Sequence, residues 1–265
     1  MNLHFLFQSE GLVIYVPSKL LSNQIVRCSF PPGRSFTLTN IDNDLYALTR
    51  PDSLSDRLAS YQRRKMFQAF LDITGVQAAD TILDVGATSD RTLSHSNYLE
   101  AWYPHKDRIT ASGIDDASFL EELYPGLHFV RTDARSLPFP DRSFDYLHTS
   151  AVLEHVGGRE RQADFLREAW RVARKGIFVT TPNLWFPVEF HTVMPFVHWL
   201  PPAIFRKLCT MRGLDYFASE DNLNLLSVSQ LRRLAADAGL QNIKITSVTL
   251  AGWPSNLLLS AKRAE

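Results

Sequence analysis

Residues 81–90 read Thr-Ile-Leu-Asp-Val-Gly-Ala-Thr-Ser-Asp, an apolar run that ends in small residues. The apolar and β-branched residues predict a buried strand over 81–85. Gly86 allows the backbone to turn sharply and to pass close to a ligand, because it has no side chain. Such a junction is typical of α/β sheets that bind ligands beyond the carboxyl ends of their strands. It is also a common strand-to-turn junction, so the interpretation depends on the strands that follow.

The rest of the chain alternates between strand and helix patterns. A helix is predicted to begin at Ser53, where Ser53 and Asp56 have the spacing of a capping box, and to end at Gly75. Strands separated by helices predict a doubly wound, mainly parallel α/β sheet of seven strands, with a Rossmann-like order and an antiparallel C-terminal hairpin. The further predicted elements are strands over 108–114, 127–131, 144–149 and 176–181, helices over 159–172 and 227–238, and a closing pair of strands over 242–250 and 255–261.

Two segments stand outside this pattern. Residues 1–50 form an N-terminal extension with one short predicted strand over 11–16, and we expect either a small β appendage or little order. Residues 51–265 form the α/β domain. Within it, residues 182–226 are rich in proline, tryptophan, phenylalanine and histidine, and they predict an insertion after the fifth strand. This insertion is a lid over a substrate, a membrane-facing surface, a dimer contact or a plain packed extension.

Acidic residues follow the predicted strands at the edge where ligands bind. Asp84 lies in the first strand and could order the loop or meet an ammonium group. Asp115 follows the second strand, where a carboxylate can accept hydrogen bonds from both hydroxyls of a ribose. Asp133 follows the third strand and could accept from an adenine amino group. The order of these residues favours a nucleoside ligand.

The block at 133–145, Asp-Ala-Arg-Ser-Leu-Pro-Phe-Pro-Asp-Arg-Ser-Phe-Asp, makes the pattern specific. Together with residues 81–86, Asp115 and the run Ser-Ala-Val-Leu-Glu-His at 150–155, it resembles the class I S-adenosylmethionine-dependent methyltransferases, most closely those that methylate small molecules. The resemblance covers residues 55–182 and extends loosely to the last strand. It implies S-adenosyl-L-methionine as cofactor. The cofactor-binding residues that it implies are Asp84, Gly86, Ala87, Asp115, Asp133, Ala134 and Ser150.

The chain departs from the family pattern in its first loop. The family usually has Asp-x-Gly-x-Gly-x-Gly there, whereas Thr88 and Asp90 stand where the second and third glycines would be. The helix that normally follows would offer free N–H groups to the cofactor carboxylate. This departure motivates an alternative, a catalytically silent cofactor-binding or partner-binding protein with the same fold. A nicotinamide-dependent enzyme ranks last, because the loop lacks Gly-x-Gly-x-x-Gly.

Methyl transfer needs a base only where the acceptor must lose a proton. His155 is the candidate catalytic residue, and it can equally cap a loop or bind the backbone. His191 and His198 in the insertion are further candidate bases. No metal ligand set is predicted. The acceptor is expected to be a small molecule, a sugar or a lipid-linked compound.

Composition narrows the partners. Lys and Arg together number 28, as do Asp and Glu, so the net charge is zero and no nucleic-acid partner is expected. Cys28 and Cys209 lack metal-ligand spacing; inert thiols are favoured, and one disulfide remains open. No secretory signal or membrane-spanning run is apparent, so the cytoplasm is the expected location. Peripheral membrane contact and oligomeric state are left open.

Overall fold

The computed structural model describes residues 3–9, 12–17, 53–93 and 95–264. The chain divides into two compact units, Met1–Ile41 and Asp42–Glu265. In the first unit, β1 (Leu3–Ser9) pairs with β2 (Leu12–Pro17) in antiparallel fashion. The strand predicted over 11–16 is therefore found as β2, whereas β1 was not predicted. The remaining residues of the predicted extension, Cys28 among them, lie outside the described part of the chain.

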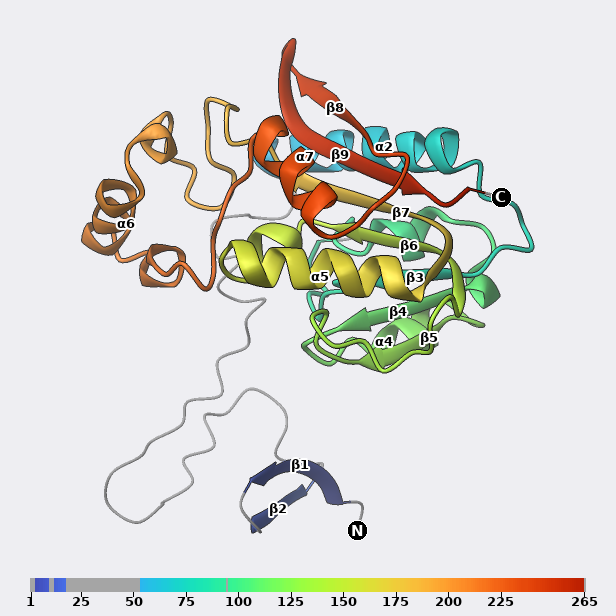
Figure 1. Ribbon diagram of the computed structural model, residues 1–265. Helices are drawn as coiled ribbons and strands as arrows, with labels where there is room; N and C mark the ends of the chain where they lie inside the picture. Colours follow the sequence, from blue (N-terminus) through green and yellow to red (C-terminus); the bar gives the residue numbers. More distant parts are fainter. Residues whose placement is uncertain (1–2, 10–11, 18–52, 94, 265) are drawn as a thin grey trace. The chain divides into compact units, whose positions relative to one another are not determined.

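The second unit is organised around a seven-stranded sheet with the order β5-β4-β3-β6-β7-β9-β8 (Figure 1). Neighbouring strands are parallel from β5 through β7, and β9 runs antiparallel to both β7 and β8. The predicted doubly wound sheet with an antiparallel closing hairpin is confirmed. The strands are β3 (Ile82–Val85), β4 (Ile109–Gly113), β5 (His128–Arg131), β6 (Phe144–Ser150), β7 (Ala173–Pro182), β8 (Lys244–Leu250) and β9 (Trp253–Lys262).

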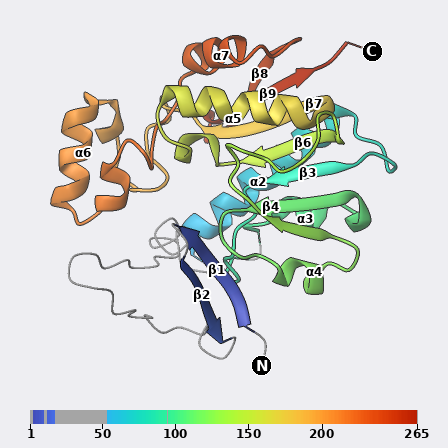
Figure 2. The same cartoon turned by 60° about the horizontal axis from the view of Figure 1, so that its bottom comes forward.

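Helices cover both faces of this sheet, as the two views show (Figures 1 and 2). Side chains alternate between the faces along each strand. In β3, Leu83 and Val85 belong to the core that includes side chains of α5 and α7, whereas Ile82 belongs to the core that includes side chains of α2, α3 and α4. The helices are α2 (Leu54–Thr74), α3 (Tyr98–Trp102), α4 (Phe119–Leu123), α5 (Arg159–Val172), α6 (Pro202–Met211) and α7 (Val228–Asp237), with short 3-10 turns η2 (Lys106–Arg108), η3 (Leu153–His155), η4 (Val197–Trp199) and η5 (Asp215–Ala218).

Helix α2 begins and ends where the sequence predicts. The Ser53 hydroxyl accepts a hydrogen bond from the Asp56 N–H at 3.1 Å, which satisfies one of the free donors of the first turn. Gly75 ends the helix with a φ of 68° and donates its N–H to the Leu71 carbonyl. The Asp56 carboxylate also lies 2.6 Å from His95 Nε2.

The insertion predicted at 182–226 packs around a small apolar core of its own. Phe205 and Cys209 of α6 are buried with Met194, Phe217 and Leu223. Its two ends meet in an isolated bridge between Asn183 and Leu226, so the segment leaves and re-enters the domain at one place. Cys209 is a buried free thiol. Within the described residues, no helix is both long enough and apolar enough to cross a membrane.

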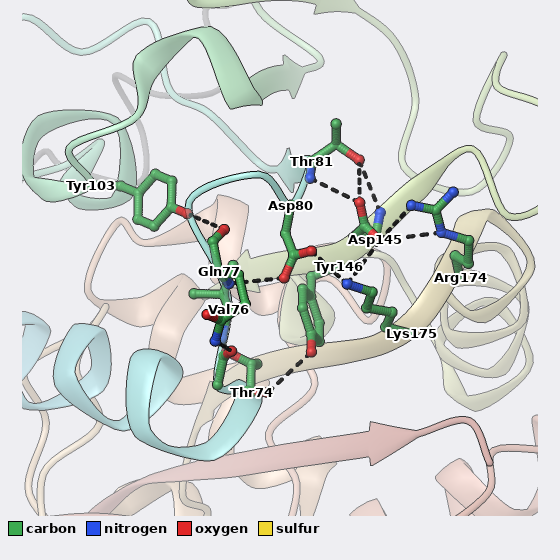
Figure 3. A network of polar contacts seen from close by, with 11 residues as sticks. Thr74, Val76, Gln77, Asp80, Thr81, Tyr103, Asp145, Tyr146, Arg174 and Lys175 are labelled. Carbon is green, nitrogen blue, oxygen red and sulfur yellow. Dashed lines mark hydrogen bonds and ion pairs between the residues drawn. The ribbon is translucent and has the colours of Figure 1, made fainter. Parts of the chain in front are cut away.

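The end of the sheet at which the parallel strands begin is held by buried charges (Figure 3). The Asp145 carboxylate accepts from the Thr81 N–H at 3.0 Å and its hydroxyl at 3.1 Å, and it pairs with Arg174 at 2.6 Å. Lys175 lies 2.5 Å from Asp80 and 3.3 Å from Asp145. These bonds lower the pKa of Asp145 to about 2 despite its burial. Asp145 thus has a structural role near the start of β6.

Replacing Asp145 by asparagine is expected to lower the free energy of unfolding at pH 7 by about 1–3 kcal/mol, because the Thr81 donors and the partly exposed Arg174 and Lys175 lose a buried charged acceptor. A carboxyl whose pKa is depressed by folding stabilises the protein above its unfolded pKa, near 4, and that contribution is lost as the pH falls through about 2. Urea unfolding of both proteins between pH 7 and pH 2 should therefore show curves that converge in acid. An equal gap at every pH would contradict this account, and Asp141→Asn, at an exposed ion pair with Arg171, is the matched control.

Candidate functional site

The sheet reverses its strand order between β3 and β6. From β3 the chain proceeds outward through β4 to β5 and then crosses back to β6 on the other side. The loops that leave β3 and β6 therefore diverge, and sheets of this kind bind ligands at the carboxyl ends of these strands. Gly86, Asp115, Asp133 and Ser150 all lie at this edge, because each stands at or directly after the end of a parallel strand. The structure thus brings together the strand ends that the sequence singled out.

A residue with a side chain at position 86 would collide with its neighbours unless the structure rearranged. Its φ is 106°, and a Cβ built on it would lie 2.1 Å from Cγ2 of Val152. The N–H groups of Gly86 and Ala87 both donate to the Ser112 carbonyl, at 2.7 and 2.9 Å. The loop therefore crosses over the end of β4, where a Cβ on Gly113 would come within 2.2 Å of the Ala87 carbonyl oxygen.

The two residues that replace the family's glycines are bound within their own loop. The Thr88 N–H donates to Asn97 Oδ1 at 2.8 Å, and Asn97 returns a bond to the Thr88 carbonyl at 3.0 Å. The Asp90 carboxylate accepts four hydrogen bonds, from the N–H and hydroxyl of Thr92, the N–H of Leu93 and the hydroxyl of Ser96. Its charge is thus satisfied locally.

The expected helix directly after this loop is absent from the described residues 86–93 and 95–97, and α3 begins only at Tyr98. The reason is that the Asp90 and Thr88 side chains take the backbone donors in turns and so compete with helix formation. A helix N-terminus therefore does not supply the donors that the sequence predicted for the cofactor carboxylate.

Two neighbouring carboxylates follow β4, and they differ in burial. Asp116 accepts from the Ser118 N–H at 3.0 Å, which lowers its pKa. Asp115 is half-buried directly after the strand. Asp115 therefore remains the candidate for the ribose hydroxyls, and Asp116 serves the start of α4.

After β5, Asp133 has a partner that the sequence did not indicate. Arg135 donates to both carboxylate oxygens, at 2.6–3.1 Å, and this pairing lowers the pKa of Asp133. A contact with an adenine amino group would share this carboxylate with Arg135. Ala134 is half-buried and packs against the core beneath α5. Ser150, at the end of β6, bonds through its hydroxyl to Thr180 Oγ1 at 2.9 Å.

The Asp84 side chain is buried and bonds to a neighbouring strand. His148 of β6 donates from Nδ1 to Asp84 at 2.5 Å, and the Tyr98 hydroxyl donates to His148 Nε2 at 2.9 Å. Glu100 is fully buried beside them. This buried cluster ties β3 to β6 and to α3, which supports the loop-ordering role of Asp84.

Burial dominates the pKa values in this cluster. It raises the pKa of Asp84 to about 6 and lowers that of His148 to about 4. Burial and the charge of Asp84 raise the pKa of Glu100 well above its usual value. Sequence reasoning missed His148, Tyr98 and Glu100, because only the fold places them together.

A second polar group lies where β6 meets the insertion. His155 Nε2 lies 3.0 Å from His191 Nε2 and 3.9 Å from Glu154 Oε1. His155 donates from Nδ1 to the Asn222 carbonyl at 2.6 Å, and His191 Nδ1 lies 2.7 Å from Glu189. Glu154 and His155 belong to η3, whereas the other three residues belong to the insertion. We call Glu154, His155, His191 and Glu189 the histidine group.

Charges within the histidine group are unevenly distributed. Burial and the neighbouring His191 lower the pKa of His155 to about 3, whereas Glu189 raises the pKa of His191 in spite of burial. The same pairing lowers the pKa of Glu189 to about 2. Burial raises the pKa of Glu154 to about 7. One positive charge is therefore held between the two rings.

Of the three histidines named as candidate bases, the structure brings two together. His198 is buried elsewhere and its Nε2 bonds to the Phe186 carbonyl at 2.9 Å. Glu189 was missed. Its Glu-x-His spacing to His191 is the only signal that the sequence contains, and it is weak.

Comparison with known proteins agrees with this geometry. Residues 83–180 match the family model described as a methyltransferase domain. The chain is 29% identical over 214 residues to a ubiquinone/menaquinone biosynthesis C-methyltransferase of Enterobacter sp., covering 75% of this chain and 81% of that protein. It is 28% identical over 134 residues to the protein of the same description from Azotobacter vinelandii, covering 47% of this chain and about half of that protein. The magnesium protoporphyrin IX methyltransferase of Synechocystis PCC 6803 with bound S-adenosylhomocysteine superposes with a TM-score of 0.50 at 15% identity, covering 83% of this chain and 91% of that one.

Proposed function

We propose that this S-adenosylmethionine-dependent methyltransferase methylates a small apolar molecule that carries an ionisable hydroxyl, such as a phenol or quinol. S-adenosyl-L-methionine is the cofactor. The methylated atom is the hydroxyl oxygen itself or a ring carbon that its ionisation makes nucleophilic. The relatives described as acting in quinone biosynthesis support a ring-bearing acceptor.

The observation that carries this proposal is the position of the histidine group. It follows β6 directly, whereas Gly86 follows the adjacent strand β3. A cofactor at Gly86 and Asp115 and an acceptor at His155 would lie on neighbouring strand ends, as in-line methyl transfer requires. The group can meet the polar end of an acceptor and assist the loss of its proton.

The insertion supports an apolar acceptor. Among the described residues, the exposed large apolar side chains are concentrated in this segment, and they include Trp185, Phe190, Phe196 and Trp199. Surfaces of this kind are typical of sites that bind apolar partners. Sugars would need more hydrogen-bonding groups. We therefore favour an aromatic or prenylated acceptor over a sugar.

The catalytically silent alternative rested on the altered loop after β3. Thr88 and Asp90 are engaged within that loop, so neither side chain needs to meet the cofactor carboxylate. No observation specifically favours the silent protein over the enzyme.

Replacing His155 by alanine is expected to lower the rate of methyl transfer by about 10²–10⁴-fold, the range for loss of a group that assists proton removal. The Kd for S-adenosylmethionine should not change. The measurement is transfer of a radiolabelled methyl group to a panel of phenols, hydroquinones with short prenyl chains, and sugars. His128→Ala, at an exposed histidine on β5, is the control.

The outcomes are distinct. Labelled products from phenols or hydroquinones, lost in the His155 variant, would support the proposal. Products formed only from sugars would overturn it, and so would equal rates of transfer by the unchanged protein and by His155→Ala. Binding of S-adenosylmethionine without transfer to any acceptor would favour the silent alternative.

A further inference from the structure

Three donor atoms converge at the end of β6. Nε2 of His155 and His191 and a carboxylate oxygen of Glu154 all lie within 4.8 Å of one another. A cation bonded at about 2.0–2.2 Å to each donor allows two donors to be at most about 4.4 Å apart. The separations of 3.0 Å between the histidines and 3.9 Å from His155 to Glu154 fall inside that limit.

The outer nitrogens of both rings are already engaged, which fixes what the inner nitrogens can do. His155 Nδ1 faces a carbonyl, that of Asn222, so it must carry the hydrogen, and the neutral ring then has a lone pair at Nε2. His191 Nδ1 faces the Glu189 carboxylate in the same way. The two Nε2 atoms lie at hydrogen-bond distance, 3.0 Å, so a proton occupies the place between them unless a metal cation displaces it and binds both lone pairs. A carbonyl or carboxylate behind a ligating histidine is the usual support for a metal ligand.

Glu154 completes the arrangement. Its side chain is fully buried, and Oε2 accepts from the Thr181 hydroxyl at 2.9 Å. Oε1, on the side of His155, is buried without a hydrogen-bond partner. A buried carboxylate oxygen that lacks a partner is costly, and a bound cation would offset that cost.

We propose that Glu154, His155 and His191 bind a divalent first-row transition-metal cation, with Glu189 and Asn222 holding the histidines in place. Two imidazoles and one carboxylate suit Zn²⁺, Co²⁺ or Mn²⁺, whereas Mg²⁺ and Ca²⁺ prefer oxygen donors throughout. Three protein ligands leave coordination positions open. The proposal that the ion binds does not depend on the proposed function.

The use of the ion rests on the proposed function. An acceptor hydroxyl coordinated to the ion would ionise more readily, releasing its proton to solvent. Its oxygen, or the ring carbon that it activates, would then form a bond to the methyl carbon while the carbon–sulfur bond breaks. The electron pair of that bond stays on sulfur, and S-adenosylhomocysteine leaves. Where a ring carbon is methylated, its hydrogen is lost as a proton and the hydroxyl re-forms.

The test is titration of tag-free, metal-stripped protein with Zn²⁺ by calorimetry, and with Co²⁺ by visible absorption, without cofactor or acceptor. We expect one equivalent to bind. His191→Ala and Glu154→Gln should each weaken binding by about 100-fold or more, and Glu189→Gln by about 10–100-fold, as for a supporting residue. His128→Ala should bind as the unchanged protein does.

Each outcome decides the question. If Zn²⁺ does not bind to the folded protein with a Kd below about 1 mM, the range of weak association, a shared proton alone occupies the histidine pair. That result would overturn the proposal. So would binding that survives both ligand variants. Circular dichroism checks that the variants fold. If His191→Ala does not fold, Zn²⁺ should still raise the thermal midpoint of the unchanged protein and not that of Glu154→Gln. Because no methyl transfer is measured, failure of the proposed function leaves this result intact.

Discussion

Replacing Asp115 by asparagine is expected to weaken binding of S-adenosylmethionine and S-adenosylhomocysteine by about 30–150-fold. The carboxylate directly after β4 is placed to accept from two ribose hydroxyls, and such charge-assisted bonds are the strong ones. Loss of the charge with retention of one amide acceptor costs about 2–3 kcal/mol, which corresponds to that range. Calorimetric titration with both nucleosides measures the change.

Asp116→Asn supplies a control one residue away. Asp116 is exposed and serves the Ser118 N–H, so its replacement should change the Kd by less than about threefold. Equal effects at the two positions would mean that net charge near the edge matters, not a directed contact. An unchanged Kd in Asp115→Asn would show that the ribose assignment is wrong.

Replacing Gly86 by alanine is expected to lower the free energy of unfolding by about 2–5 kcal/mol and to abolish measurable cofactor binding. A φ of 106° is strained for a residue with a side chain, and the new Cβ would meet Val152 Cγ2 at 2.1 Å. The strain costs about 1–2 kcal/mol and the overpacking about 1–3 kcal/mol. Urea unfolding and nucleoside titration measure the two effects.

A second substitution separates the two causes. Val152→Ala removes the methyl group that the new Cβ would meet, so it should restore the overpacking share of the loss in Gly86→Ala but not the share due to strain. The double-mutant cycle should therefore show a positive coupling of about 1–3 kcal/mol. Additive effects would mean that the loop moves away instead of colliding with Val152.

Local patterns were sufficient for most of the elements. The helix predicted over 159–172 has those bounds as α5, because its apolar residues follow helical spacing to the last turn. The strand over 81–85 was found one residue shorter as β3. The helix that the family pattern places after the first loop begins only at Tyr98, as α3, since Asp90 captures four donors through contacts that this pattern does not contain. For the insertion, the sequence indicated an unusual composition but no helices or strands, because the fold of this segment depends on its own small core.

The site divides in the same way. The position of Gly86 and Asp115 at the carboxyl edge of the sheet could be predicted, because each follows a strand whose place in the sheet is set by the alternation of elements. The pairing of His155 with His191 joins residues 36 positions apart, and that of Asp84 with His148 joins residues 64 positions apart. Such contacts are determined by the insertion and by the adjacency of β3 and β6. No periodicity along the chain reports them.

Strand β6 carries different duties at its two ends. Asp145, near its start, belongs to the ion pairs that secure the sheet, and Ser150 at its end leads into the turn with Glu154 and His155. With a rise of about 3.3 Å per residue, the two ends lie roughly 17 Å apart. Substitutions at the start of β6 are thus expected to change the stability of the sheet, and substitutions after its end are expected to change the proposed site. Substitutions in the turn or the insertion are therefore expected to alter the proposed acceptor site while the ion pairs at the opposite end of β6 stay in place.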